Sequence, residues 1–190
     1  MKNKKVHNLV ISKVMPFVTP IWSSRIGDSF EKEIKTCYQI EKEISSEIKS
    51  NVGGYQSGNI CLRTRFWSLT NKLSPVLEKI AEDIGMSLEV CNTWININRK
   101  NNFNKLHLHP HCAFSVVVYL KTNENSGKIT FYNPATVDSF PINDTLNHFY
   151  GTYSFIPEVG DVLVFPAYLK HFVEPNLSDD DRISIAFNLK

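Results

Sequence analysis

Three histidines stand close together in the middle of the chain, and another follows further along. His107, His109 and His111 lie within five residues, and His171 comes after a short apolar segment. Neutral imidazole nitrogens are good ligands for iron, zinc, copper and nickel. Alternate side chains of a strand share a face, so His107 and His109 would point to the same side and bind one metal ion. A third ligand must come from elsewhere in the fold, and His171 is the natural candidate.

Arg182 is the second residue whose position suggests chemistry. On a final strand, Arg182 and Ser184 would face the interior, while Ile183 and Ile185 would face the opposite way. A buried guanidinium is costly unless an anion meets it, and its planar fork fits a carboxylate. The pattern therefore predicts a clamp for a dicarboxylate. The alternative is that Arg182 pairs with the acidic residues 179–181 of the preceding loop.

Two stretches in the first half of the chain have the periodicity of helices. Apolar residues recur at three- and four-residue steps over residues 29–48, where Ser29 is the expected N-cap. A second apolar stripe covers residues 69–86, with Pro75 at an early turn or a break and Gly85 near the end. We expect both helices to cover the outer face of a sheet.

From residue 88 onward the apolar pattern changes to the two-residue period of strands. The predicted strands, which turn-forming segments separate, are residues 90–97, 115–120, 128–132, 151–155, 161–165, 171–173 and 183–189. Helices followed by short strands predict an α+β, mainly β fold, a jelly roll buttressed by two N-terminal helices. We expect a single domain over residues 1–190, with residues 1–87 as helical support and 88–190 as the jelly-roll core.

The remaining segments carry weaker signals. Residues 14–22 contain two prolines among apolar neighbours, which favours an edge strand or an extended arm. Residues 55–64 look like a polar linker. Residues that line a substrate pocket are expected in 133–150 and 55–67. His7 and His148 are expected to be ordinary structural or surface residues.

Composition limits the class of protein. The chain has 190 residues, of which 42% are hydrophobic, and a net charge of +2, so it can bury one core and nucleic acid is not indicated as a partner. Four cysteines without a CxxC pair predict free, at least partly buried thiols in a reducing compartment. No segment is long enough for a membrane span or a signal peptide. We expect a cytoplasmic protein with no membrane partner, and a homodimer is compatible with these properties.

Several segments of the second half together resemble a known family. They are residues 94–98 (WININ), 107–110 (HLHP), 115–120 (SVVVYL), 160–166 (GDVLVFP), His171 and 182–188 (RISIAFN). This set is similar to the Fe(II)/2-oxoglutarate-dependent oxygenases, in particular to a short branch found in phages and marine bacteria. If the chain is phage-encoded, it would act in the host cytoplasm.

The resemblance implies a double-stranded β-helix with Fe(II) at the open end of the barrel. It implies that 2-oxoglutarate chelates the metal and places its far carboxylate on Arg182. The gap of eleven residues between His171 and Arg182 (182 − 171) is similar to the family's usual gap. The implied metal ligands are His107, His109 and His171, and the implied 2-oxoglutarate-binding residues are Arg182, Ser184, Tyr119 and Asn98.

One position departs from the family's pattern. The usual ligand set is His-x-Asp/Glu followed by a distant His, whereas His109 stands in the place of the carboxylate. Three histidines can hold iron, but they leave out one negative charge. Two alternatives remain open: His109 supports the ligands without binding the metal, or His111 takes the place through a bend at Pro110.

The activity implied by the resemblance couples the decarboxylation of 2-oxoglutarate by O2 to the hydroxylation of a second substrate. Succinate and CO2 are released, and the sequence does not identify the second substrate. Two other functions remain: a cupin-like three-histidine metalloenzyme that does not use 2-oxoglutarate, and a non-catalytic jelly roll that binds a ligand or builds a phage structure.

Overall fold

The structure is a computed structural model that describes residues 18–135 and 151–190. Its helices are α1 (Glu31–Glu43), α2 (Leu62–Arg65) and α3 (Trp67–Ile84). Its strands are β1 (Trp22–Arg25), β2 (Asn51–Val52), β3 (Tyr55–Gln56), β4 (Val90–Asn98), β5 (Phe103–His107), β6 (Phe114–Lys121), β7 (Ile129–Tyr132), β8 (Thr152–Phe155), β9 (Asp161–Pro166), β10 (His171–Val173) and β11 (Arg182–Leu189).

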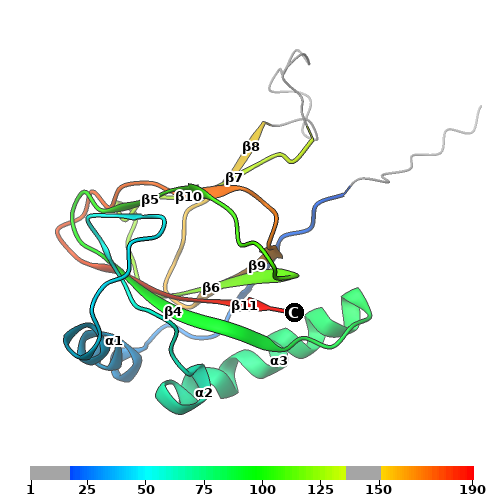
Figure 1. Ribbon diagram of the computed structural model, residues 1–190, viewed down its shortest axis with the longest axis horizontal. Helices are drawn as coiled ribbons and strands as arrows, with labels where there is room; N and C mark the ends of the chain where they lie inside the picture. Colours follow the sequence, from blue (N-terminus) through cyan, green and yellow to red (C-terminus); the bar gives the residue numbers. More distant parts are fainter. Residues whose placement is uncertain (1–17, 136–150) are drawn as a thin grey trace, which may run out of the picture.

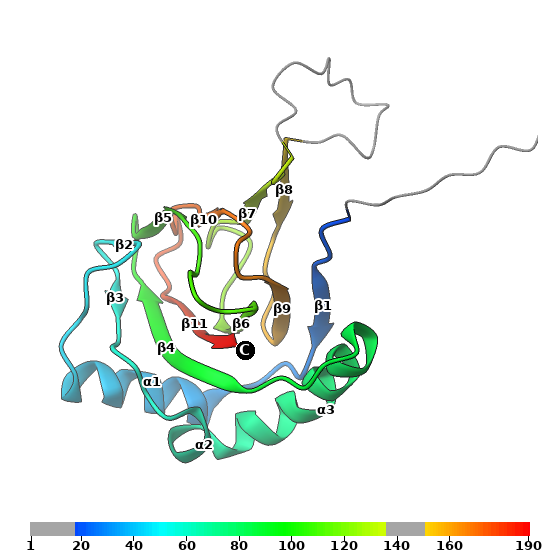
Figure 2. The same cartoon turned by 45° about the vertical axis from the view of Figure 1, so that its right-hand side comes forward.

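Two antiparallel sheets face each other and enclose the interior between them (Figures 1 and 2). One sheet has the strand order β1-β9-β6-β11-β4-β3, and the other has the order β2-β5-β10-β7-β8. The strands from β4 to β11 divide equally, with β4, β6, β9 and β11 in the first sheet and the rest in the second. This architecture confirms the coarser part of the prediction, a mainly β fold of two antiparallel sheets of the jelly-roll kind.

The N-terminal strands β1, β2 and β3 each occupy an edge of a sheet. The edge strand expected within residues 14–22 instead begins at Trp22 and pairs with β9, and residues 14–17 lie outside the described part of the chain. The predicted polar linker is wrong, since it contains β3, which pairs with β4, and the short helix α2. Strands of two residues have no measurable period, so the sequence pattern missed them.

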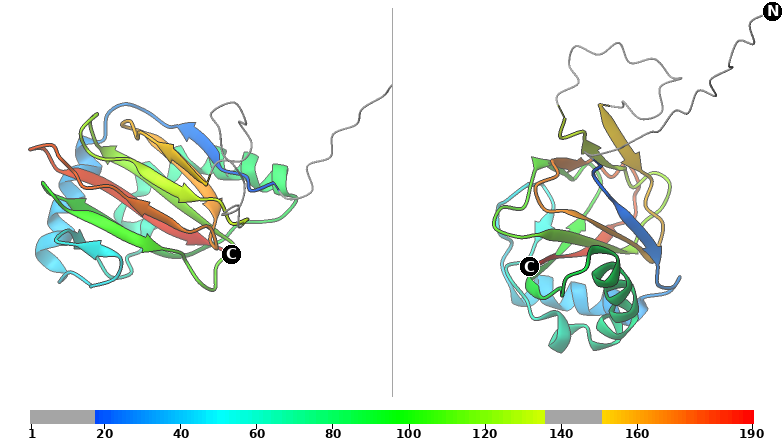
Figure 3. Two further views of the ribbon diagram at one scale, coloured as in Figure 1. Left: turned by 90° about the horizontal axis from the view of Figure 1, so that it is seen from above. Right: turned by 90° about the vertical axis from the view of Figure 1, so that its right-hand side faces the viewer.

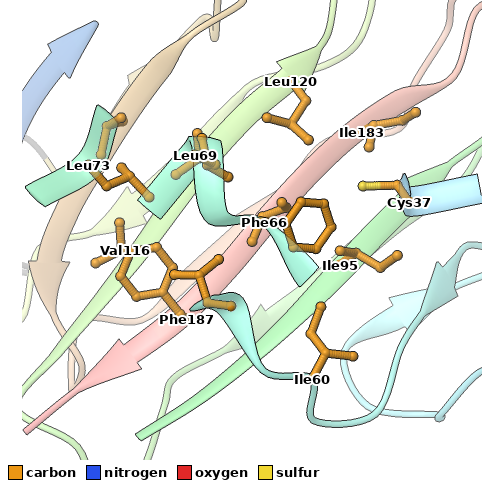
Figure 4. Close-up of a cluster of buried hydrophobic side chains, with 14 of the residues drawn as sticks. Cys37, Ile60, Phe66, Leu69, Leu73, Ile95, Val116, Leu120, Ile183 and Phe187 are labelled. Carbon is orange, nitrogen blue, oxygen red and sulfur yellow. The ribbon is translucent and has the colours of Figure 1, made fainter. Parts of the chain in front are cut away.

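All three helices lie against the outer face of the six-stranded sheet, on the side away from the five-stranded sheet (Figures 1 and 3). Alternate strand residues such as Ile95, Val116 and Ile183 point toward them and are almost fully buried. They form one apolar cluster with helix residues that include Cys37 and Leu69 (Figure 4). Apolar surface buried on this side stabilises the sheet by roughly 25 cal/mol per Å².

The first helix is shorter than the periodicity predicts. It ends at Glu43, because Ile44 is extended and the Tyr55 hydroxyl donates to the Ile44 carbonyl at 3.0 Å. Ile48, expected on the apolar face, is 90% exposed. Ser29 is not the N-cap, since Phe30 holds that position without a side-chain cap and buries its ring in the core.

The third helix runs through its proline without interruption. Pro75 lies inside α3, so the predicted early turn or break there is wrong. The buried face of the helix includes Leu69, Leu73 and Ile80, as the spacing predicts. Gly85 ends the helix in the left-handed conformation at φ 69°, and its N–H donates to the carbonyl oxygens of Ala81 and Glu82.

A second apolar cluster is built around Phe131, Leu163 and Phe165, with Val117 and Tyr119 beside them. The cavity described below adjoins this cluster, since Val117, Tyr119 and Phe165 also line it.

The cysteines agree in part with the expectation of free, at least partly buried thiols. Cys37 is buried and Cys112 half-buried, whereas Cys61 and Cys91 are exposed, and all four are free thiols. Within residues 18–135 and 151–190, no helix is long and apolar enough to cross a membrane.

Gly160 lies in the turn before β9, where the backbone passes close to Gly27. Its φ is +85°, its N–H donates to the Tyr119 carbonyl at 2.8 Å, and a Cβ would lie 1.7 Å from the Gly27 oxygen. We expect Gly160→Ala to lower the free energy of unfolding by roughly 3 kcal/mol in urea titrations. Gly85→Ala is the matched control, because its φ is also positive but nothing lies within 4 Å, and it should cost only about 1 kcal/mol. Equal losses would contradict this reading.

Candidate metal centre

The structure brings together the three histidines that the sequence singled out. Antiparallel pairing of β5 with β10 places His171 directly opposite His107, and their ring centroids are 4.2 Å apart. His109 follows the end of β5, where its backbone N–H donates to the Ala167 carbonyl at 2.9 Å. Its ring lies 5.2 Å from each of the other two. One ligand nitrogen from each side chain lies within 4.8 Å of the others, so the group could hold one metal ion.

Backbone carbonyls orient two of the imidazoles. The Nδ1 atom of His107 lies 2.7 Å from the Lys105 oxygen, and the Nδ1 atom of His171 lies 2.9 Å from the Leu169 oxygen. A carbonyl can only accept, so each neutral ring carries its proton on Nδ1 and leaves the Nε2 lone pair as the acceptor. Such outer hydrogen bonds are what fixes the tautomer and direction of histidines that bind metals.

His109 lies outside β5, and ring stacking positions its side chain. It stacks on Trp94 with the centroids 5.3 Å apart, and its Nε2 atom lies 3.4 Å from that of His171. Beside it lies the Asn188 amide, whose oxygen accepts from the Ser115 hydroxyl at 2.7 Å. The expectation that β5 continues through His109 is wrong, because the strand ends two residues earlier, yet the side chain still reaches the group.

His111 does not join the site. It is exposed, has a left-handed φ of 67° and is not part of the group of three. The alternative in which a bend at Pro110 brings His111 to the metal is therefore wrong. The loop instead turns this residue outward.

Burial keeps the three imidazoles neutral. It lowers the pKa of His109 to about 4, with the nearby His107 as a second cause, and it lowers the pKa of His171 well below the usual range. The pKa of His107 is also lowered by burial. Because a metal binds the deprotonated ring, protons would compete little with a metal near pH 7.

The histidines open into a cavity of about 450 Å³ between the two sheets. Side chains from both sheets line it, and among the described residues no aspartate or glutamate is one of them. Besides the three histidines, the polar and charged residues of the lining are Lys49, Ser50, Gln56, Asn96, Asn98, Asn104, Lys105, Ser115, Tyr119, Arg182, Ser184 and Asn188.

Arg182 lies in this cavity and is only 1% exposed. Its Nη1 atom donates to the carbonyl oxygens of Ser126 and Glu174, the latter at 2.9 Å. Its Nη2 atom is buried and has no hydrogen-bond partner among the described residues. A buried unpaired donor on a cation is costly, which indicates that a ligand atom meets it.

The acidic residues before Arg182 are engaged elsewhere. Asp179 pairs with Lys100 at 2.6 Å, and Asp180 pairs with Lys121 at 2.9 Å. Asp181 accepts from the Tyr38 hydroxyl at 2.8 Å. The alternative in which these residues pair with Arg182 is therefore wrong.

A row of polar side chains crosses the six-stranded sheet beside Arg182. Strand register places Tyr119, Ser184, Asn96 and Gln56 side by side on β6, β11, β4 and β3. Asn98 pairs with Arg182 in the next position. The side-chain oxygens of Asn96 and Gln56 and the amide nitrogen of Asn98 are buried without partners among the described residues. These unpaired groups line the same cavity and could receive a polar ligand.

Sequence reasoning missed part of this lining. Lys49, Asn104 and Lys105 all line the cavity: Asn104 and Lys105 lie on β5, and Lys49 lies shortly before β2, which pairs with β5. The polar sequence around residue 50 was the only available signal. Of the pocket-lining segments expected from the sequence, residues 55–67 contribute Gln56 alone, and 136–150 lie outside the described residues, as do His7 and His148.

The buried imidazoles make the stability of the metal-free protein depend on pH. In the unfolded chain their pKa is near 6.5, so above that value both states are neutral and nothing changes. Below it the unfolded chain takes up protons first, so the free energy of unfolding should fall from about pH 6.5 to about pH 4. Urea titrations over this range should show that the free energy of unfolding falls less steeply with decreasing pH in His109→Gln than in the wild type, by at most about 1.4 kcal/mol per pH unit. Identical slopes would contradict the burial effect.

Comparison with known proteins agrees with this geometry. A family model described as "Putative 2OG-Fe(II) oxygenase" matches residues 92–188, which are 97 of the 190 residues and include His107, His109, His171 and Arg182. No curated protein sequence matches the chain.

Solved structures similar to the chain share its fold at low sequence identity. A Pseudomonas putida prolyl-4-hydroxylase is 13% identical, with a TM-score of 0.60 over 90% of this chain and 91% of that one. HygX from Streptomyces hygroscopicus, solved with nickel, 2-oxoglutarate and hygromycin B, is 14% identical, with a TM-score of 0.59 over 90% and 82%. The viral collagen prolyl hydroxylase from Paramecium Bursaria Chlorella virus-1, in a 2OG complex, is 11% identical, with a TM-score of 0.59 over 89% and 94%. Since the family model spans half of the chain, the protein belongs to the 2OG-Fe(II) oxygenases, an oxidoreductase family that uses Fe(II) and 2-oxoglutarate.

Proposed function

We propose that the protein is an Fe(II)- and 2-oxoglutarate-dependent dioxygenase that hydroxylates a second substrate with release of succinate and CO2. The observation that carries the proposal is the meeting, in one cavity, of three inward-facing imidazoles and a buried guanidinium with an unpaired donor. The first group suits a metal and the second suits a carboxylate. Family membership supplies the same pair of cofactors.

The metal would be held by His107, His109 and His171. The Nδ1–H groups of His107 and His171 are already bonded to the backbone, so their Nε2 lone pairs are available for the ion. Three protein ligands would leave positions for 2-oxoglutarate and O2, as in other non-haem iron oxygenases. When bound, the iron supplies the oxidising chemistry, and the protein contributes the ligands and the orientation of the reactants.

Arg182 would anchor the far carboxylate of 2-oxoglutarate through its free Nη2 donor. Ser184 and Tyr119 stand in register on the neighbouring strands and can add hydroxyl donors, and Asn98 adds its unpaired amide. Burial raises the pKa of Tyr119 above its usual range, so its hydroxyl keeps the proton that it would donate. The backbone carbonyls on Nη1 hold the guanidinium in place before any ligand arrives.

The apolar cluster beside the cavity would keep water away from the reacting groups. Phe165 and Phe131 pack against His171 with ring centroids 4.8 and 5.7 Å from it, and they also contact each other at 4.8 Å. Val117 and Ala186 complete this wall of the cavity. A site dry on one side strengthens the interaction between charged ligands and oriented donors.

The primary substrate is not identified by the fold. The prolyl hydroxylases and HygX are too distant in sequence for their substrates to be transferred, and O2 is the only partner that the proposed reaction fixes besides the two cofactors. The residues free to meet the substrate are Trp94, Asn96 and Gln56 along the cavity wall. A single domain over residues 1–190, a cytoplasmic location and membership of the phage and marine-bacterial branch stay predictions.

A second candidate function is favoured by one residue. His109 in place of a carboxylate gives a three-histidine site, which a cupin-like metalloenzyme could use without 2-oxoglutarate. In that case Arg182 would bind the substrate itself. A non-catalytic jelly roll is disfavoured, because it gives no reason for three imidazoles that converge on one point of the cavity.

An anaerobic titration separates these functions. Fe(II) is added to the metal-free protein, followed by 2-oxoglutarate, and the visible spectrum is recorded. We expect a metal-to-ligand charge-transfer band only when both are present. Iron binding without the band would favour the cupin-like enzyme, and the absence of iron binding would leave a binding or structural role.

Arg182 should control the affinity for 2-oxoglutarate and not that for iron. We expect Arg182→Ala to weaken 2-oxoglutarate binding, measured from the band, by at least about 30-fold, because the buried carboxylate loses its charged partner. Arg182→Lys, which keeps the charge and fills more of the space, should recover part of the loss. Arg25→Ala is the control, since Arg25 is a half-exposed arginine on the edge strand β1, where it pairs with Glu158. Equal weakening of iron and 2-oxoglutarate in Arg182→Ala would count against the clamp.

A further inference from the structure

We infer that the metal and 2-oxoglutarate bind this protein as a strongly coupled pair, because the dianion supplies the negative charge that no side chain in the cavity provides. The inference rests on the proposed function and adds a binding linkage to it. It predicts that the metal is held weakly until the dicarboxylate arrives, and that one residue, His109, sets the strength of this dependence.

The charges that line the cavity are all of one sign. Lys49, Lys105 and Arg182 are cationic, and no aspartate or glutamate belongs to the lining among the described residues. The three candidate ligands are imidazoles, and a metal binds the neutral ring. A divalent ion at this point would therefore keep its full charge within an already positive cavity.

Acidic residues near the cavity pair with groups other than the candidate metal ligands. Glu47 pairs with Lys49 at 3.5 Å at the exposed rim and offsets that one charge. Glu174, which lies near Arg182, accepts from the Lys128 backbone N–H at 3.1 Å. Asp161, on the strand next to Tyr119, pairs with Arg25 at 2.9 Å. None of these carboxylates lines the cavity, so a metal ion there would have no negative side chain beside it.

Burial makes the imbalance costly. His171 is 4% exposed and Arg182 is 1% exposed, so water screens the ion and the guanidinium poorly. The two like charges disfavour each other across the cavity. A dicarboxylate bound between them would neutralise both, and thermodynamic linkage then requires each ligand to tighten the other by the same factor.

His109 is the position where this chain differs from the usual ligand set. An Asp or Glu there would place one negative charge on the metal without any co-substrate. His109 packs on Trp94 and reaches the group with a neutral nitrogen instead. Restoring the carboxylate should therefore strengthen metal binding alone and reduce its dependence on the dianion.

The test is isothermal titration calorimetry of Ni(II), a redox-inert substitute for iron, into metal-free protein. Each titration is made without additive, with saturating 2-oxoglutarate, and with saturating glutarate. Glutarate has both carboxylates but lacks the keto group, so it reports the effect of charge without chelation. The proteins are the wild type, His109→Asp and the matched neutral variant His109→Asn, which has the same shape as Asp without its charge.

We expect 2-oxoglutarate to tighten Ni(II) binding to the wild type by about 100-fold and glutarate to tighten it by about 5-fold or more. In His109→Asp, Ni(II) alone should bind at least about 10-fold more tightly than in His109→Asn, and the effect of 2-oxoglutarate should fall to about 10-fold or less. The wild-type arm with glutarate needs no variant, so it tests the charge effect even if a substitution disturbs folding.

Three results would overturn the inference. They are equal Ni(II) affinity of the wild type with and without 2-oxoglutarate, no effect of glutarate, and equal affinities of His109→Asp and His109→Asn for Ni(II) alone. A wild-type protein that does not bind Ni(II) even with 2-oxoglutarate would overturn the inference together with the proposed metal site. Tight Ni(II) binding that ignores 2-oxoglutarate would overturn the coupling and leave the metal site intact.

Discussion

The pairing of β5 with β10 is the contact on which the site depends. It sets His171 opposite His107, and it leaves β10 joined to β7 on its other side, where Phe131 backs the imidazole of His171. Because side chains alternate along a strand, a slip of one residue would turn one of the histidines out of the cavity. The strands β2 and β7 flank this pair in the same sheet and extend its hydrogen bonding on both sides.

The site combines two polar groups from opposite sheets. The histidines come from β5, its following loop and β10, while Arg182 and its row of polar neighbours come from the six-stranded sheet. The jelly roll brings these groups face to face across the cavity, with an apolar cluster adjoining it. A metal ligand set and a carboxylate anchor therefore meet only after both sheets have formed.

Much of this could be read from the sequence, for identifiable physical reasons. The strands β4 and β11 have clear two-residue periods, and β6 is a continuous apolar run. His107, His109 and His171 could be recognised as candidate metal ligands from their residue type and the alternation of strand side chains. The edge strands β2 and β3 could not be predicted, because two residues have no period. The end of α1 was also missed, because the Tyr55 hydroxyl that caps the turn at Ile44 is a tertiary contact. Local pattern therefore finds the long strands and their inward-facing residues better than short edge strands and helix ends.

The central claim is that the three imidazoles hold a metal and that Arg182 holds the far end of 2-oxoglutarate. A crystal structure of the protein prepared anaerobically with Fe(II) and 2-oxoglutarate tests it most directly, with anomalous scattering at the iron edge to locate the ion. The account predicts iron bonded to the Nε2 atoms of His107, His109 and His171, and a dicarboxylate whose distal oxygens meet Arg182 Nη2. Iron bound without His109, or a dicarboxylate that does not reach Arg182, would contradict it.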